Sequence, residues 1–220
     1  LFSGTFSDVT DQVAGGSSAN TLAGIAISNY TVDGTKGAWQ YSTDGGTSWT
    51  ALGSTTTTTA VTLTTTAMLR FVPAANYNGA ATALSANLIE SGQAIVSGAI
   101  VDLTGATGGT THISAATVAL GETITAVNDA PVASGSATLA AIAEDTAAPA
   151  GATVTALFSG TFSDVTDQVA GGSSANTLAG IAISNYTVDG TKGAWQHSTD
   201  GGTTWAALGT TTTTTAVTLN

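Results

Sequence analysis

The sequence predicts an all-β protein made of antiparallel β-sandwich modules in tandem. Three observations lead to this prediction. Short segments in which apolar and small polar residues alternate recur along the chain, separated by glycine-rich turns. No segment from Leu1 to Val127 has the sustained 3.6-residue apolar period and the end caps of a helix. A long stretch of the sequence also occurs twice, which is typical of a repeat architecture.

The duplicated stretch runs without a gap from residues 1–64 to residues 157–220, a period of 156 residues. Such near-identity indicates recent copying within one gene. The chain opens inside a repeat, so we expect it to be a window of a longer array. Residues 1–127 would form one module that lacks its first strand, and residues 128–220 would start the next. Only five of the 64 paired positions differ, namely Tyr41/His197, Ser48/Thr204, Thr50/Ala206, Ser54/Thr210 and Thr64/Asn220.

Alternating patterns place the strands in order along the chain. The threonine run at 54–59 fits an exposed strand, because threonine is β-branched, with an O-glycosylated patch as the alternative. Pro73 is expected to close the strand that precedes it. The predicted strands lie at 1–6, 60–63, 67–73, 81–88, 94–103, 112–119, 123–127 and 137–143, together with one or two strands at 22–32 and a hairpin at 37–52.

The hairpin carries three aromatic side chains, Trp39, Tyr41 and Trp49, around an Asp-Gly-Gly turn. A three-residue loop would place Tyr41 opposite Trp49, on the same face as Trp39, and His197 opposite Trp205 in the second copy. We interpret these rings as part of a core. The alternative is a sugar-stacking platform, which would make the chain a carbohydrate-binding module that binds surface glycans.

Composition disfavours several classes of partner. The chain has 14 acidic and 3 basic residues, a net charge of −11, and no basic patch, which disfavours nucleic acid and anionic membrane surfaces. No apolar run approaches the roughly 20 residues that span a bilayer, so no membrane insertion is expected. The lack of cysteine excludes disulfides and thiolate metal sites.

Catalysis is not predicted. The chain has two histidines, and one of them, His197, is replaced by Tyr41 in the other copy, which does not fit a catalytic role. No nucleophile elbow, phosphate loop or zinc motif occurs.

Acidic and amide residues gather around a short joint at 125–132, which ends an alternating run and contains Pro131. Oxygen ligands without histidine or cysteine suit Ca²⁺ better than Zn²⁺. Solvated turn residues are the alternative explanation of the same pattern. The candidate calcium ligands are Asn128, Asp129, Glu144, Asp145, Asp164 and Asp167, and Asp8 and Asp11 are the first-copy counterparts of the last two.

Five segments of the chain resemble the cadherin-like repeats, related to the VCBS and tandem-95 families, of giant bacterial surface adhesins. They read TAVNDAPV at 125–132, AEDT at 143–146, FSDVTD at 6–11 and 162–167, GAWQYSTDGGTSW at 37–49 and LRFVPAANYNG at 69–79. Valine and threonine interrupt the acidic run that the family often shows after FSD. The 156-residue period is also longer than a module of about 100 residues.

The resemblance implies immunoglobulin-like or cadherin-like sandwiches, an extracellular place on the bacterial cell surface, and calcium at the linkers between repeats. Asn128 and Asp129 would then be linker ligands, and Asp164 and Asp167 would reach back to them. Glu144 and Asp145 would serve this joint or the far end of their own module, and Asp8 and Asp11 an upstream joint.

The function predicted from these features is structural. We expect a segment of a surface adhesin or extracellular fibre that acts as a calcium-stiffened rod or as a self-associating filament. Its partners would be neighbouring repeats of the same chain and other copies of itself.

Overall fold

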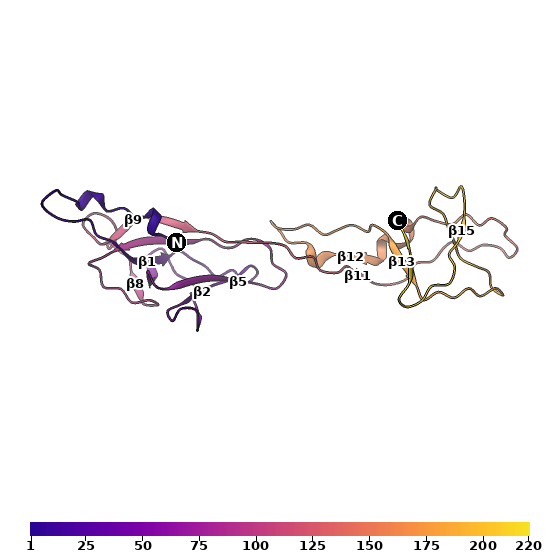
Figure 1. The fold of residues 1–220 in the computed structure, drawn as a ribbon, viewed down its shortest axis with the longest axis horizontal. Helices are drawn as coiled ribbons and strands as arrows, with labels where there is room; N and C mark the ends of the chain where they lie inside the picture. Colours follow the sequence, from indigo (N-terminus) through magenta and orange to yellow (C-terminus); the bar gives the residue numbers. More distant parts are fainter. The chain divides into compact units, whose positions relative to one another are not determined.

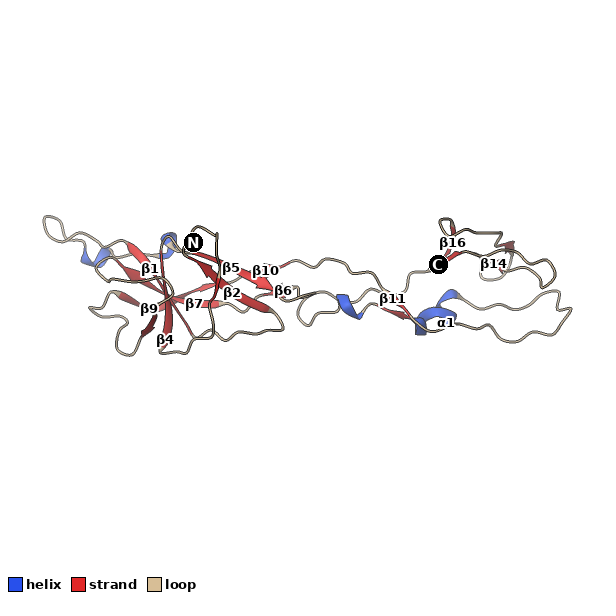
Figure 2. Ribbon diagram, turned by 90° about the horizontal axis from the view of Figure 1, so that it is seen from below, coloured by secondary structure: helices blue, strands red, loops and turns tan.

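The computed structural model describes residues 1–220 and confirms the all-β, antiparallel prediction (Figures 1 and 2). Its helices are short, and none is long and apolar enough to cross a membrane. The chain divides into two compact units. The first unit contains Leu1–Val127 and Val169–Ser174, and the second contains Asn128–Gln168 and Ala175–Asn220.

The larger sheet of the first unit has five strands in the order β8-β4-β1-β7-β9. The central strand β1 needs a glycine in its interior, because a Cβ at Gly24 would lie 2.2 Å from the carbonyl oxygen of Leu63. Along the sheet the strands are β8 (Ile100–Asp102), β4 (Thr59–Thr64), β1 (Leu22–Ser28), β7 (Leu84–Glu90) and β9 (Ile113–Leu120).

The smaller sheet of this unit has three strands in the order β3-β2-β5. They are β3 (Thr50–Ala51), β2 (Gly37–Ser42) and β5 (Met68–Pro73), and the proline is the last strand residue, as predicted. A separate two-stranded pair joins β6 (Gly79–Ala80) to β10 (Thr123–Ile124). Two 3₁₀ turns, η1 (Ser3–Thr5) and η2 (Val9–Asp11), precede the first strand.

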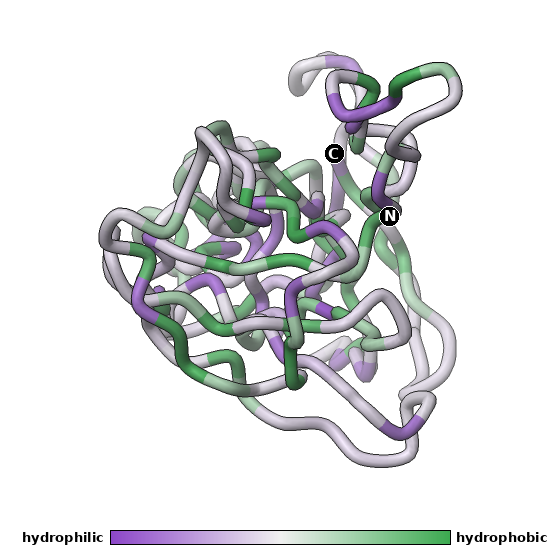
Figure 3. The backbone as a smooth tube through the Cα atoms, turned by 90° about the vertical axis from the view of Figure 1, so that its left-hand side faces the viewer, coloured by the Kyte–Doolittle hydropathy of each residue, from purple (hydrophilic) through white to green (hydrophobic).

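Both sheets of the first unit contribute side chains to one core. Ile27, Leu63 and Leu84 are 0–1% exposed, and the ring of Trp39 lies edge-on at 5.5 Å from that of Phe71. The other face of the five-stranded sheet carries a smaller cluster, so β1 is buried on both faces. Along the backbone, hydrophobic stretches (green) alternate with pale stretches of intermediate hydropathy (Figure 3). The second cluster consists of Ala26, Ala60, Ile89 and Leu103.

Two strand predictions are wrong because hydroxyl side chains form hydrogen bonds with the nearby backbone, which then folds into turns. At 1–6 the chain forms the turn η1, in which the Thr5 hydroxyl donates to the carbonyl of Phe2 at 2.8 Å. In the threonine run, Thr56 Oγ1 accepts from the backbone N–H of Thr59 at 2.9 Å, and the strand starts only at Thr59.

Other predicted strands differ in extent. Of 94–103 only Ile100–Asp102 forms a strand, of 123–127 only the first two residues do, and 137–143 forms none. The prediction at 81–88 is displaced toward the C-terminus, to Leu84–Glu90.

In the second unit, the duplicated residues reproduce the pairing of the first. Ile181 pairs with Leu219 as Ile25 pairs with Leu63, and Gln196 pairs with Ala207 as Gln40 pairs with Ala51. One short helix is not predicted by the sequence pattern, and it starts where Thr153 Oγ1 accepts from the Ala156 N–H. The elements of this unit are β11 (Val132–Ala133), α1 (Val154–Phe158), η3 (Ser159–Thr161), β12 (Phe162–Ser163), η4 (Val165–Asp167), β13 (Ile181–Ser184), β14 (Gln196–His197), β15 (Ala206–Ala207) and β16 (Ala216–Leu219).

Candidate functional site

A two-strand pairing places the start of the second unit beside its acidic loop. Strand β11 pairs with β12, with Val132 opposite Ser163 and Ala133 opposite Phe162. Because β11 follows the joint directly and the turn η4 follows β12 closely, the pairing brings residues 128–131 next to residues 164–167. The proline at 131 favours the extended backbone that enters β11.

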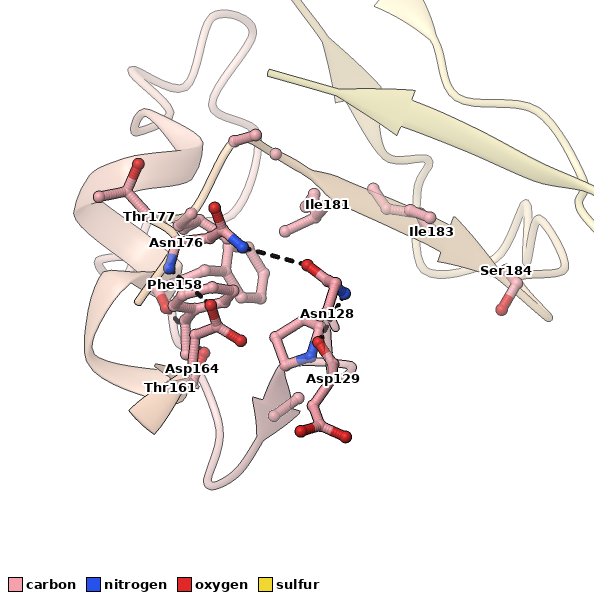
Figure 4. A pocket seen from close by; sticks show the side chains of 17 residues that line it. Asn128, Asp129, Phe158, Thr161, Asp164, Asn176, Thr177, Ile181, Ile183 and Ser184 are labelled. Carbon is pink, nitrogen blue, oxygen red and sulfur yellow. Dashed lines mark hydrogen bonds between the residues drawn. The ribbon is translucent and has the colours of Figure 1, made fainter. Parts of the chain in front are cut away.

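Four of the six candidate ligands lie together here. The backbone N–H of Asp129 donates to Asp167 Oδ1 at 2.9 Å. A further residue, Asn176, joins both sides: its side-chain amide donates to Asn128 Oδ1 at 3.2 Å, and its backbone N–H donates to Asp164 Oδ2 at 2.5 Å (Figure 4). The joint and the acidic loop are thus tied by hydrogen bonds within one unit.

Two of the three carboxylates in this group, those of Asp164 and Asp167, are buried. Asp164 is 5% exposed and Asp167 is 7% exposed. One oxygen of Asp164, Oδ1, is buried and has no hydrogen-bond partner. Burying a carboxylate oxygen without a partner is costly, and a bound cation is one way to offset that cost.

The oxygen ligands here are of the type that a hard cation prefers, but the site has few acidic side chains. Carboxylate and amide oxygens suit Ca²⁺, which takes about six to eight oxygen ligands. However, no group of three or more His, Cys, Asp or Glu side chains lies close enough to hold a metal. An ion at Asp164 would therefore need amide, backbone or water oxygens as well, and Asn128 contributes a side-chain amide oxygen to the same hydrogen-bond network.

The other two candidates lie apart from this group. Glu144 and Asp145 form an exposed turn that does not line the cavity beside Asp164. The turn is local: Asp145 has a φ of +62°, and the Thr146 hydroxyl donates to the carbonyl of Ala143 at 2.7 Å. The structure does not bring this pair to the joint.

The first copy shows what the joint adds. Asp8 Oδ2 accepts from the backbone N–H of Asn20 at 2.6 Å, just as Asp164 does from Asn176. Asp8 is only partly buried and Asp11 is exposed, however, whereas their counterparts are buried. The local sequence therefore forms the acidic loop, and the burial of its carboxylates depends on residues that pack on it.

A cavity of about 710 Å³ adjoins the acidic group, and its apolar wall includes Phe158, Ile181 and Ile183. The first-copy counterparts of these residues, Phe2, Ile25 and Ile27, are core residues with 8%, 6% and 0% exposure. In the first unit, strand β7 pairs with β1 and contributes Leu84, Ala86 and Leu88 to this core. We therefore interpret the apolar part of the cavity as core residues of the repeat, not as a ligand pocket.

The hairpin register differs from the predicted one. Tyr41 lies opposite Thr50, not Trp49, and His197 lies opposite Ala206, not Trp205. The turn is wider than three residues because the Asp44 carboxylate accepts from both the backbone N–H and the hydroxyl of Ser48, at 2.9 and 2.6 Å. These hydrogen bonds, led by the one from the Ser48 hydroxyl, lower the pKa of Asp44 to about 2.

The three aromatic rings do not form one exposed surface. Trp39 is 3% exposed, and its indole N–H donates to the carbonyl of Thr82 at 2.7 Å. Tyr41 packs against the core, and the guanidinium carbon of Arg70 lies 4.0 Å from the ring centroid of Trp49. This burial favours the core interpretation and does not support a sugar-stacking platform.

Sequence reasoning missed Asn176, which links the joint to the acidic loop. Its contact with Asp164 uses a backbone N–H, which any residue except proline supplies, so no residue pattern marks it. Comparison of the chain with protein-family models, with curated proteins and with solved structures gives no match.

Proposed function

We propose that this chain is a structural segment of an extracellular tandem-repeat protein, a bacterial surface adhesin or fibre, built from immunoglobulin-like or cadherin-like β-sandwiches. The observation that carries the proposal is the duplication, in which only five of 64 positions differ. Copies of this kind lengthen a protein without adding a new activity, which suits a spacer. The sandwich assignment is supported by the two antiparallel sheets of the first unit, which share one core.

We further propose that Ca²⁺ binds where the joint meets the acidic loop and stiffens it. Support comes from the buried, unpartnered Asp164 Oδ1, from the buried Asp167 and from the oxygen of Asn128. A divalent cation would neutralise the two carboxylates and hold the joint at residues 128–129 against the loop. Asn128, Asp129, Asp164 and Asp167 would take part in this site, and Glu144 and Asp145 are left out of it.

The test is calcium binding to the full chain, with Asp164→Asn as the variant and Asp8→Asn as its matched control. Extracellular modules bind Ca²⁺ with Kd values of about 10⁻⁴–10⁻³ M, so ~10 mM Ca²⁺ should stabilise the second unit by roughly 1.4–2.7 kcal/mol. Asp164→Asn should abolish most of that gain, and Asp8→Asn should leave it unchanged, because Asp8 is only partly buried and is not covered by a joint.

Isothermal titration calorimetry measures the binding, and thermal unfolding with calcium or with a chelator measures the stabilisation. If chelation leaves the unfolding curve of the wild-type chain unchanged and titration gives no heat of binding, the calcium proposal fails. The spacer proposal would then rest on the duplication alone.

A further inference from the structure

One short segment of the second copy belongs to the first unit. Residues Val169–Ser174 form a closed glycine loop, in which the N–H of Val169 donates to the carbonyl of Ser173 at 3.0 Å and that of Gly172 to the carbonyl of Val169 at 2.9 Å. The first-copy loop at 13–17 has the same two hydrogen bonds at the same distances. The loop therefore has a conformation set by its own sequence, and its contacts can be compared between the two copies.

In the first unit, this loop lies against the turn that contains Asn78. The side-chain amide of Asn78 contacts Ser173 at two points: Oδ1 accepts from the backbone N–H at 2.6 Å, and Nδ2 donates to the hydroxyl oxygen at 2.8 Å. Asn78 is 7% exposed. A paired donor and acceptor of this kind recognises a backbone N–H next to a hydroxyl, so the contact selects for a hydroxyl side chain as well as for loop shape.

Glycines permit the close approach of the loop to the turn. A Cβ at Gly172 would lie 2.2 Å from Asn78 Oδ1 and 2.5 Å from the Asn78 carbonyl oxygen. The backbone of Gly172 does not have a positive φ, so its own conformation does not require glycine. On the turn side, a Cβ at Gly79 would lie 3.0 Å from the carbonyl oxygen of Gly171. The contact with Asn78 thus accounts for the absence of a side chain at position 172.

The first-copy loop has the same sequence and no such partner. The three atoms nearest to a Cβ at Gly16 would all belong to Val13, within its own loop. Ser17 is exposed, and its hydroxyl donates to the carbonyl of Asp11, also nearby in sequence. An identical, already folded loop is therefore displayed without the turn that its second copy binds.

We propose that the Gly-Gly-Ser loop is a docking element that fastens a repeat to the Asn-Gly turn of another copy of the repeat. The loop at 169–174 binds the turn at Asn78 and Gly79 of its own chain. The loop at 13–17 binds the same turn in another molecule of this chain. This inference rests on the proposed tandem-repeat role and names its partner, and it does not depend on calcium.

Amide hydrogen exchange of the full chain, measured by NMR in the presence of a chelator, tests the docking. Ser17 and Ser173 have the same neighbours in sequence, so their intrinsic exchange rates are equal. We expect Ser173 to exchange roughly tenfold more slowly or more, the factor that one net hydrogen bond provides. Gly172→Ala should bring the two rates together, and the matched variant Gly16→Ala should leave the protection of Ser173 intact.

The same variants test binding to a second copy. In Gly172→Ala the turn at Asn78 is vacant while the loop at 13–17 is intact, so sedimentation should show association that rises with concentration. The double variant Gly16→Ala/Gly172→Ala should stay monomeric. In the wild-type chain the tethered loop has a millimolar effective concentration and should suppress association.

The proposal is overturned if Ser173 and Ser17 exchange equally in the wild-type chain, or if the single and double variants associate alike. Calcium titration separates this outcome from failure of the metal site. If Ser173 is protected and calcium does not bind, only the calcium proposal fails. If calcium binds and Ser173 is not protected, only the docking proposal fails.

Discussion

The two copies of one tryptophan offer a test of how burial determines stability. Trp39 is 3% exposed, contacts Phe71 edge-on and donates its indole N–H to Thr82, whereas its counterpart Trp195 is 57% exposed. Replacing a buried tryptophan by alanine costs about 3–5 kcal/mol, and an exposed replacement usually stays within about 0.5 kcal/mol. At about 4 °C per kcal/mol for a unit of this size, Trp39→Ala should lower the melting temperature of the first unit by roughly 12–20 °C.

The assay is calorimetric unfolding of the wild-type chain and of the variants Trp39→Ala and Trp195→Ala. The first-unit transition should shift only in Trp39→Ala, because Trp195 is an exposed residue of the second unit. Equal shifts in the two variants would refute the reasoning from burial. Retention of the wild-type melting temperature in Trp39→Ala would do the same, and would reopen the sugar-stacking role of this ring.

Three further outcomes follow from single contacts. Asp44 should titrate by NMR with a pKa of about 2, and Ser48→Ala should raise that pKa. The ionised Asp44 carboxylate therefore stabilises the fold fully above the ordinary carboxyl pKa of 3.8, and this stabilisation is lost as the pH falls through 2. Thr55→Val should cost about 1–3 kcal/mol in denaturant unfolding, since it leaves the buried N–H of Tyr30 without its acceptor. Gly24→Ala should cost about 1–3 kcal/mol, because its Cβ would overlap a neighbouring carbonyl.

Each of these predictions has a control or a contrary outcome. An Asp44 pKa near 3.8 in the wild-type chain would mean that the Ser48 hydrogen bonds do not form in solution. Thr57→Val is the control for Thr55→Val, because Thr57 is exposed in the same run, and similar costs for both would argue against the Tyr30 contact. An unchanged denaturation midpoint in Gly24→Ala would mean that strands β1 and β4 lie further apart than the structure places them.

The strands of the first unit could be predicted wherever apolar alternation was regular. The segments that became β1, β4 and β5 alternate, and each is a strand close to its predicted place. Three of the failures fall where a side chain competes with the strand pairing for the backbone hydrogen-bonding groups. Thr5, Thr56 and Asp44 each hydrogen-bond to nearby main chain, and each changes a predicted strand or hairpin register. Residue type alone does not indicate which partner such a side chain selects.

The sequence predicted which acidic residues form the candidate site, but not how they are arranged. The clustering of Asn128, Asp129, Asp164 and Asp167 follows from placing the joint and the acidic loop as neighbours, which the resemblance to cadherin-like repeats implies. The separation of Glu144 and Asp145 and the link through Asn176 do not follow, since they depend on a two-residue strand pairing and a backbone N–H. Short pairings of this kind leave almost no periodic signal in a sequence.

The duplication separates what a segment specifies by itself from what its neighbours add. Both copies have the same glycine loop, the same hydroxyl-to-Asp turn, at Asp44 and Asp200, and the same strand register, so these are local properties. Burial is not local: Trp39 is buried and its counterpart Trp195 is exposed, and Asp167 is buried and its counterpart Asp11 is exposed. A repeat of this kind therefore carries folded contact surfaces that become buried only when partner residues cover them.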